Sequence, residues 1–152
     1  MTIEVREPIP ADEAAWRRMW TGYVEFYEEP EHAVRGESLW KQLLDPDDAF
    51  QCRLAVAAGE MAGFVNFFEH PDTWFEKPVC YLADLFVEPS VRRGGVGRTL
   101  IEEVERVSKE RGCQHVYWHT QDHNDTARSL YDDITGGTSG FIMYELPRAV
   151  GP

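Results

Sequence analysis

A glycine-rich stretch in the second half of the chain has the residue types and spacing of an anion-binding loop. It covers residues 92–98, reads RRGGVGR, and stands directly before an amphipathic run. Glycine lets the backbone bend sharply, so that consecutive N–H groups at a helix start converge on an anion. The arginines add positive charge. The stretch therefore predicts a site for a ligand that carries phosphate groups.

The spacing excludes two other phosphate-binding loops. A P-loop ends in Gly-Lys-Ser/Thr, and Gly97-Arg98-Thr99 lacks the four-residue lead from an earlier glycine. A dinucleotide fingerprint set on Gly95 and Gly97 needs a third glycine where the chain has Leu100. A plain turn that links a strand to a helix without binding a ligand stays open as the structural alternative.

The length and composition fit one domain. The 152 residues are 43% hydrophobic and 12% aromatic, which suffices for one well-buried core and is too little for two ordinary domains. We expect a single globular domain over residues 1–147, followed by a short C-terminal tail over residues 148–152.

The net charge disfavours two classes of partner. Twenty-seven acidic residues against 15 basic ones give a formal net charge of −12, and such a field repels phosphate backbones and anionic lipids. The apolar stretches also fall well short of the ~20 residues that a membrane helix needs. We therefore expect no nucleic-acid partner and no membrane partner.

The cysteines and the N-terminus predict a cytoplasmic protein. Cys52, Cys80 and Cys113 are odd in number, far apart and without a C-x-x-C pair, which favours reduced thiols over a disulfide framework. Residues 1–10 contain no basic region followed by an apolar run, so we expect no secretory signal.

The apolar periodicity indicates which elements position the glycine-rich loop. It predicts, in order, a strand over 2–6, a helix from Asp12 or Glu13 to before Pro30, a short helix over 38–44, antiparallel strands over 52–57, 61–68 and 79–87, a helix over 97–111, a strand over 115–119, a helix capped by Asn124 or Asp125, and a strand over 141–146. The loop thus joins a central strand to the most regular helix.

With these elements in place, the motifs resemble those of the GNAT acyltransferases. The acetyl-CoA loop of that family has the pattern Arg/Gln-x-x-Gly-x-Gly/Ala, which residues 92–97 match, and Val87-x-Pro89 precedes it at the usual place. Residues 124–131, with the pattern N-x-x-A-x-x-L-Y, look like the family's second cofactor motif. The order of elements is similar over nearly the whole chain.

The resemblance implies an α/β (α+β) fold with a mixed, mostly antiparallel sheet that is splayed at its central strands and flanked by about four helices. It also implies acetyl-CoA as cofactor and CoA as product. Pantetheine would lie between the strands at 81–87 and 115–119, and the pyrophosphate would rest on the N–H groups of residues 93–98. The implied cofactor-binding residues are Leu85, Phe86, Val87, Arg92, Arg93, Gly94, Gly95, Val96, Gly97, Arg98, Asn124 and Tyr131.

Acetyl transfer to an amine needs a base for the amine and an acid for the departing thiolate. Tyr131 suits the acid role, because a phenol of pKa ~10 is protonated at neutral pH and can donate to a thiolate of pKa ~8.5. The polyamine acetyltransferases, which this chain resembles over 81–87, usually carry Glu followed by Asp where it has Ala83 and Asp84. Asp84 is the candidate base; a water chain to another acid, or a structural role for Asp84, stays open because strand alternation sets Ala83 and Asp84 on opposite faces.

The N-terminal region predicts the acceptor. Its acidic residues are interleaved with aromatic ones, which attracts cations, although a solvated helix over core aromatics would look the same. In the resembled family this region usually lines the acceptor pocket, and the candidate substrate-binding residues are Tyr23, Tyr27, Glu28 and Trp74. We expect a small cationic or primary-amine acceptor: a polyamine, an amino acid or a basic peptide.

A closer likeness is to small GNAT enzymes that include fungal histone and amino-acid acetyltransferases and lie near the diamine enzymes. It rests on residues 70–74, the strand at Tyr81 and residues 118–121. This subgroup resemblance implies an N-acetyltransferase that often acts as a homodimer.

Two features of the sequence suggest alternatives to acetyl transfer. His115, His119 and His123 stand four apart, but along a strand they spread over ~13 Å, so we expect no metal site. A non-catalytic acyl-CoA-binding or regulatory module on the same fold is the main alternative. The missing Glu at position 83 favours that module, and Tyr131 argues against it.

Overall fold

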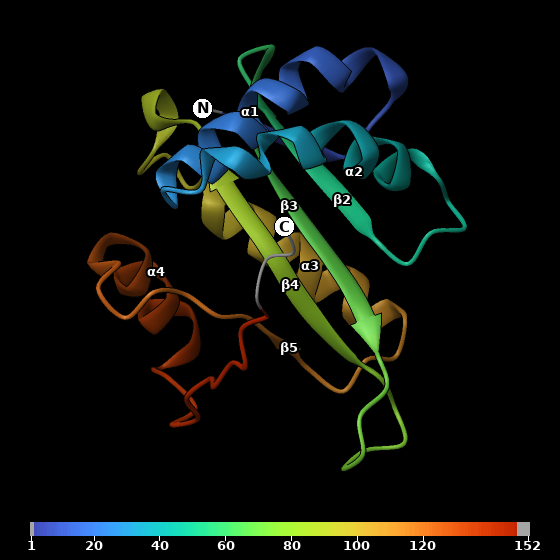
Figure 1. Ribbon diagram of the computed structural model, residues 1–152, viewed down its shortest axis with the longest axis vertical. Coiled ribbons are helices and arrows are strands. Elements are labelled where there is room, and N and C mark those ends of the chain that lie inside the picture. The colour runs from blue at the N-terminus through green and yellow to red at the C-terminus, as the bar shows by residue number, and fades with distance from the viewer. Residues whose placement is uncertain (1, 149–152) are drawn as a thin grey trace. The chain divides into compact units, whose positions relative to one another are not determined.

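The strands of the chain build one five-stranded sheet (Figure 1). The computed structural model describes residues 2–148. The strands are β1 Ile3–Arg6, β2 Gln51–Ala57, β3 Glu60–His70, β4 Val79–Val87 and β5 Val116–Tyr117. The α-helices are α1 Glu13–Phe26, α2 Arg35–Leu44, α3 Val96–Glu110 and α4 Asp125–Thr135, and the 3₁₀ turns are η1 Pro10–Asp12, η2 Pro30–Val34 and η3 Pro89–Val91.

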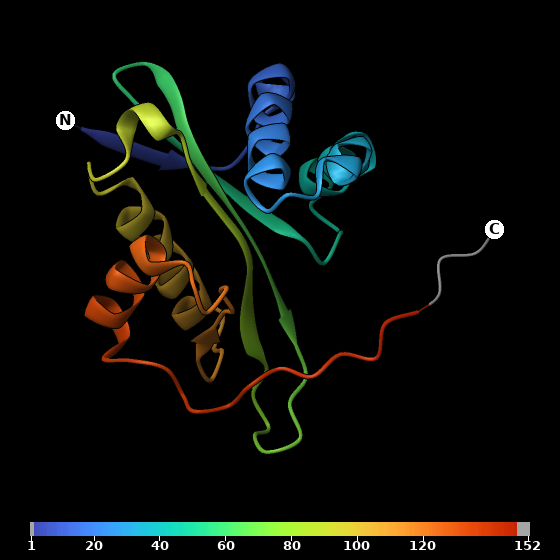
Figure 2. The same ribbon diagram turned by 60° about the vertical axis from the view of Figure 1, so that its left-hand side comes forward.

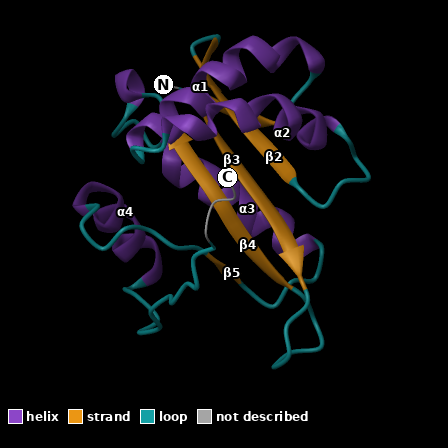
Figure 3. Cartoon of the chain, in the orientation of Figure 1, coloured by secondary structure: helices purple, strands orange, loops and turns teal. Residues whose placement is uncertain are grey.

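The sheet has the order β1-β2-β3-β4-β5, and β3 and β4 are its long central pair (Figure 3). Neighbours from β1 to β4 are antiparallel, whereas β5 runs parallel to β4. A parallel pair needs a crossover, which α3 provides. The predicted fold class, a mixed and mostly antiparallel sheet flanked by helices, is confirmed.

The chain divides into two compact units, Met1–His119 and Thr120–Pro152. The first holds the whole sheet with α1, α2 and α3, and the second holds α4. The domain boundary expected at residue 147 lies within the second unit and stays a prediction. Of the expected tail, residues 149–152 lie outside the described part of the chain.

Helices cover both faces of the sheet in the first unit. Figure 2 shows α1 and α2 on one side of the strands and α3 on the other. On the α1 side, the Trp16 ring lies 5.8 Å from the ring of Phe64 in β3 and 5.3 Å from that of Trp40 in α2. On the α3 side, Arg53 of β2 pairs with Glu103 at 3.5 Å. The two faces therefore carry different residues of each strand, as a two-residue repeat requires.

An irregularity in β4 interrupts this repeat. Asn66 of β3 pairs with Asp84, but the next residue, Phe67, pairs with Leu82, so Ala83 has no partner in β3. One extra residue in a strand forms a β-bulge and reverses the faces of the residues beyond it. Asp84 and Tyr81 consequently lie on the same face of the sheet, which simple alternation does not predict.

Two sequence predictions need correction. Residues 141–146 were expected to form a last strand, but no element of the structure includes them, and Tyr144 is 88% exposed. Their apolar composition is typical of a strand, yet a strand forms only against a partner, and the described residues supply none there. The strand expected over 115–119 shrinks to β5, because only Val116 and Tyr117 pair with β4.

Candidate functional site

The glycine-rich loop follows the end of β4 and leads into α3. Gly95 is the N-cap of α3 and adopts a left-handed backbone with φ 86°, and Arg93 adopts φ 69°. A residue other than glycine lowers the stability of the fold by ~1–2 kcal/mol in that conformation. Backbone strain of this kind is concentrated at functional sites. The turn directs the first N–H groups of α3, which have no acceptor within the helix, out of its N-terminus.

Arg92 fixes the loop to its surroundings. Its Nε donates a hydrogen bond to the Val87 carbonyl at 3.1 Å, and its guanidinium lies 5.7 Å from the Phe26 ring centroid. Arg93 and Gly94 are exposed, whereas Val96 and Gly97 are buried. The loop therefore has a fixed base and an exposed tip of positive charge, which fits a phosphate-bearing group.

The edge of β4 beside the loop is open. Among residues 2–148, β5 pairs with β4 only through Cys80 and Tyr81, so Leu85, Phe86 and Val87 have no strand on that side. A strand edge without a partner presents N–H and C=O groups to an added chain or ligand. The resemblance predicted an extended ligand arm at these residues, and the structure has the open edge that such an arm requires.

Asp84 lies at the centre of a hydrogen-bonded group on the α1 face. Asn66 Nδ2 donates to Asp84 Oδ2 at 3.1 Å, and the Tyr23 hydroxyl also donates to the Asp84 carboxylate. Burial raises the pKa of Asp84 above its usual value, while the two hydrogen bonds lower it. A carboxylate whose pKa is raised by burial accepts protons more readily than an ordinary one, as a general base requires.

Asn66 is a site residue that the sequence reasoning missed. Its side chain is buried, 3% exposed, and its Oδ1 has no hydrogen-bond partner in the structure. A signal was present in the sequence, because Asn66 is the one polar residue in the run from Met61 to Phe68. A buried polar group inside an apolar strand calls for a specific partner, which here is Asp84.

Of the four residues predicted to bind the acceptor, two lie close to Asp84 and two are exposed. Tyr23 contacts Asp84, and the Tyr27 ring lies 5.1 Å from the Tyr23 ring. Burial, together with the charge of Asp84, raises the pKa of Tyr27. Glu28 is exposed and has φ 60°. Trp74 lies in the loop between β3 and β4 and is 82% exposed. The structure therefore brings together Tyr23, Tyr27 and Asp84 of the predicted set.

The second unit holds the other two predicted site residues. Asn124 is the N-cap of α4, as predicted, and its Oδ1 accepts a hydrogen bond from the Ala127 N–H at 3.4 Å. Tyr131 lies in the middle of α4 and is half-buried. Gly136, with φ 87°, ends the helix.

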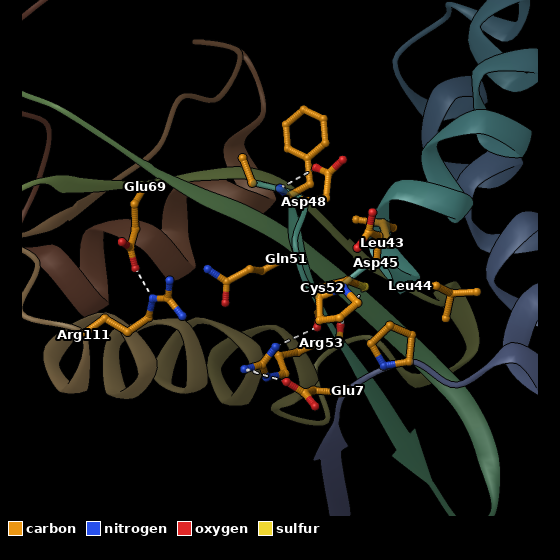
Figure 4. A pocket seen from close by; sticks show the side chains of 14 residues that line it. Glu7, Leu43, Leu44, Asp45, Asp48, Gln51, Cys52, Arg53, Glu69 and Arg111 are labelled. Atoms are coloured by element: carbon orange, nitrogen blue, oxygen red, sulfur yellow. Dashed lines mark hydrogen bonds and ion pairs between the residues drawn. The ribbon is translucent and has the colours of Figure 1, made fainter.

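A separate pocket lies at the start of β2 and has a structural explanation. Its volume is about 390 Å³, and Glu7, Arg53, Glu69 and Arg111 are among its lining residues. Figure 4 shows that these charged groups pair with one another, Arg53 with Glu7 at 3.6 Å and Arg111 with Glu69. Arg53 also donates to the Cys52 carbonyl at 2.9 Å. These pairs join neighbouring elements, and the other two charged lining residues, Asp45 and Asp48, accept hydrogen bonds from the backbone N–H groups of Asp47 and Phe50.

Neither a metal cluster nor a membrane span is found in the described part of the chain. Residues 2–148 contain no group of three or more His, Cys, Asp or Glu side chains that could hold a metal ion. The helices in the same range are too short or too polar to cross a bilayer.

Comparison with known sequences identifies relatives along nearly the whole chain. Residues 14–136 match the family model described as Acetyltransferase (GNAT) family. The D-amino-acid N-acetyltransferase HPA3 of Saccharomyces cerevisiae is 32% identical over 145 residues, which are 94% of this chain and 89% of that enzyme. The thialysine N-epsilon-acetyltransferase of Caenorhabditis elegans is 30% identical over 81 residues, 53% of this chain and 50% of that enzyme.

Solved structures share the fold. The aminoglycoside N-acetyltransferase AAC(6')-Iy, solved in complex with CoA, has a TM-score of 0.77 and 21% identity, and the match covers 97% of this chain and 96% of that one. At that identity the likeness establishes the architecture, and the sequence relatives carry the family assignment.

Proposed function

This chain belongs to the GNAT acetyltransferase family, and from that membership we propose that it transfers the acetyl group of acetyl-CoA to a primary amine by direct attack in a ternary complex. The observation that carries the proposal is the Asp84 carboxylate, held by Asn66 and Tyr23 on the face of β4, the strand that leads into the glycine-rich loop. One strand thus presents a base on its face and an open edge beside an anion-binding turn.

The loop and the β4 edge fit acetyl-CoA. Residues 93–98 offer backbone N–H groups and arginine charge to the pyrophosphate, and Leu85, Phe86 and Val87 offer backbone groups to the pantetheine arm. Bound acetyl-CoA supplies the thioester carbonyl as the electrophile. We also propose Asn124 as a contact of the pantetheine arm, because it stands where the family's second cofactor motif has its Asn.

Asp84 and Tyr131 have complementary roles in the proposed reaction. As the C–N bond to the amine forms and the C–S bond breaks, Asp84 accepts the proton that the amine nitrogen loses. Tyr131 gives its phenol proton to the departing thiolate, since a phenol of pKa ~10 is protonated at neutral pH. Each proton has a defined donor and acceptor, and no redox step is involved.

The charge near Asp84 and the substrates named for two relatives support a primary-amine acceptor. Asp84, the Tyr23 that contacts it and the neighbouring Tyr27 ring form an anionic, aromatic site that favours a cation, and Glu28 and Trp74 are proposed as further contacts. The named relatives act on an amino acid and on thialysine. We propose a small primary amine, such as an amino acid, a polyamine or the amine of a basic peptide.

We propose a homodimer, supported by the exposed apolar segment over residues 141–146. Its large apolar side chains are Phe141 83%, Ile142 76%, Met143 68%, Tyr144 88% and Leu146 82% exposed. Contiguous apolar surface of this kind is typical of an interaction site, which a second copy of the chain would cover.

We propose a cytoplasmic location on the basis of the thiols. All three cysteines are free, and burial raises the pKa of the Cys80 thiol to about 12. Neutral, buried thiols suit a reducing compartment.

Release of CoA thiol from acetyl-CoA tests the function. The panel pairs the protein with polyamines, amino acids and basic peptides, and CoA binding is followed in parallel by thermal shift. Thiol release that depends on an amine supports the proposal. Binding of CoA without release for any amine would instead support the non-catalytic acyl-CoA-binding module.

A further inference from the structure

Three aromatic rings lie side by side across β3, β4 and β5. The Tyr81 ring centroid lies 5.5 Å from that of Phe68 and 4.9 Å from that of Tyr117. His70 and His119 flank these rings, and all five residues are at least partly exposed. We call the five residues the aromatic strip.

The aromatic strip lies on the same sheet face as Asp84. Asn66, Phe68 and His70 alternate along β3 and therefore share one face. Asn66 bonds to Asp84, the Phe68 ring contacts Tyr81, and His70 Nε2 lies 2.6 Å from the Tyr117 hydroxyl. The bulge at Ala83 makes this possible, because without it Tyr81 would face α3.

The polar atoms of the strip are paired with one another. Besides the bond between His70 and Tyr117, His119 Nδ1 lies 3.3 Å from the Tyr81 hydroxyl. Both tyrosine hydroxyls are thus engaged at the ring edges. The aromatic strip therefore presents mainly the carbon atoms of its rings to a ligand. These atoms form an apolar surface on the same face as the Asp84 carboxylate.

We propose that the aromatic strip holds the body of the acceptor while its amine is at Asp84, and that it selects primary amines that carry an aromatic group. The inference rests on the proposed acetyl transfer and narrows its acceptor. Aromatic rings gain both buried apolar area and ring–ring contact on such a surface. The five residues of the strip include no carboxylate, so a linear polyamine would gain only cation–π contacts there and no ion pair.

Matched acceptors isolate the contribution of the aromatic group. Ethylamine and phenethylamine differ by one phenyl group, as do alanine and phenylalanine, and spermidine represents the polyamines. For every pair that is acetylated, we expect kcat/KM to be about tenfold or more higher for the phenyl member, as burial of one ring predicts. Equal values within the pairs, or a higher value for spermidine than for every phenyl acceptor, would overturn the inference.

Variants of the strip test whether it is the source of the selectivity. Tyr117→Leu should reduce the preference for the phenyl member several-fold, whereas Tyr117→Phe, which keeps the ring, should retain that preference. Phe75→Leu is the control, because Phe75 is an exposed ring in the loop between β3 and β4. Selectivity that survives Tyr117→Leu, or that Phe75→Leu removes equally, would overturn the inference.

The outcomes separate the inference from the function on which it rests. Acetylation of several amines without phenyl preference contradicts the inference and leaves the proposed function in place. Absence of thiol release with every amine contradicts both.

Discussion

Asn66 Nδ2 donates a 3.1 Å hydrogen bond to Asp84 Oδ2 across the pair of strands that forms the centre of the sheet. The amide is buried and the carboxylate is half-buried, so the bond fixes the orientation of an anion that water solvates only in part. Hydrogen bonds to charged groups stabilise by roughly 1.5–3 kcal/mol. Because Asn66 and Asp84 are paired, substitution of either residue tests the proposed role of Asp84 as the general base.

Asp84→Asn should abolish most of the activity and stabilise the fold. Loss of a general base lowers the rate by about 10²–10⁴-fold, while CoA affinity should stay unchanged. Burial raises the pKa of Asp84 in the folded state, so ionised Asp84 destabilises the fold, increasingly as pH rises from ~3.9 through the folded-state pKa. The Tm of the variant should therefore exceed that of the wild type at pH 7 and converge with it in acid. An unchanged kcat/KM would remove Asp84 from the base role.

Tyr23→Phe should shift the acid limb of the pH–rate profile to higher pH. The Tyr23 hydroxyl lowers the pKa of Asp84, so its removal raises that pKa, and the ionised base then forms only at higher pH. Asn66→Leu should move the limb in the same direction. The midpoint of the rise in kcat/KM with pH is the measurement. A lower rate with an unmoved midpoint would mean that these residues do not act through Asp84.

Gly95→Ala should weaken CoA binding by on the order of tenfold, because the added methyl group would stand where the pyrophosphate approaches the loop and cost about one hydrogen bond to a charged group. Gly59→Ala is the matched control. Both glycines have a left-handed backbone, φ 86° and φ 78°, and a Cβ meets nothing within 4 Å at either. Each variant should therefore lose ~1–2 kcal/mol of stability. Calorimetry should find weaker CoA binding for Gly95→Ala alone, and equal affinities would contradict the loop assignment.

Tyr131→Phe should lower kcat by about 10²–10³-fold with little change in CoA affinity, because it removes the proton donor and keeps the ring. Leaving groups of lower thiol pKa need less protonation, so an acetyl thioester of an acidic thiol should recover part of the rate. A wild-type kcat at every pH would exclude the acid role.

Ile142→Glu should convert the proposed dimer into a monomer, because it sets a charge in the exposed apolar segment. Val34→Glu is the control, since Val34 is an isolated apolar side chain that is 79% exposed, against 76% for Ile142. Light scattering gives the mass of each variant. A monomeric wild type, or dimers for both variants, would contradict the proposal.

The sequence predicted the elements that local patterns determine. The helix after the glycine-rich loop was placed at 97–111 and is found at Val96–Glu110, because its apolar residues recur at helical spacing. The three central strands were likewise found, since their runs are long and separated by clear turns. The glycine-rich turn before this helix is also found, with Gly95 as the N-cap in a left-handed conformation, whereas its role in anion binding stays a prediction.

What the sequence did not predict depends on pairing between distant residues. The bulge at Ala83 arises from the register of β4 against β3. Alternation along the sequence contains no sign of it and so does not predict that Asp84 and Tyr81 share a face. The prediction of a strand over 141–146 was wrong for the same reason. An apolar composition favours a strand but does not specify the neighbouring strand with which it would pair. Asn66 was not predicted as a site residue, because its hydrogen bond to Asp84 depends on the pairing of β3 with β4.

The bulge has a practical consequence for anyone who redesigns the pocket. A library that randomises every second position of β4 would mutate Leu82 together with Asp84 and Phe86. Leu82, however, pairs with Phe67 of β3, whose ring lies on the α3 side of the sheet. Such a library would damage the hydrophobic core while it leaves the pocket wall at Tyr81 unchanged. The productive positions are 81 and 84, with Phe86 kept because it belongs to the buried core, and homologues that lack the extra residue should be aligned with a one-position gap at Ala83 before their pockets are compared.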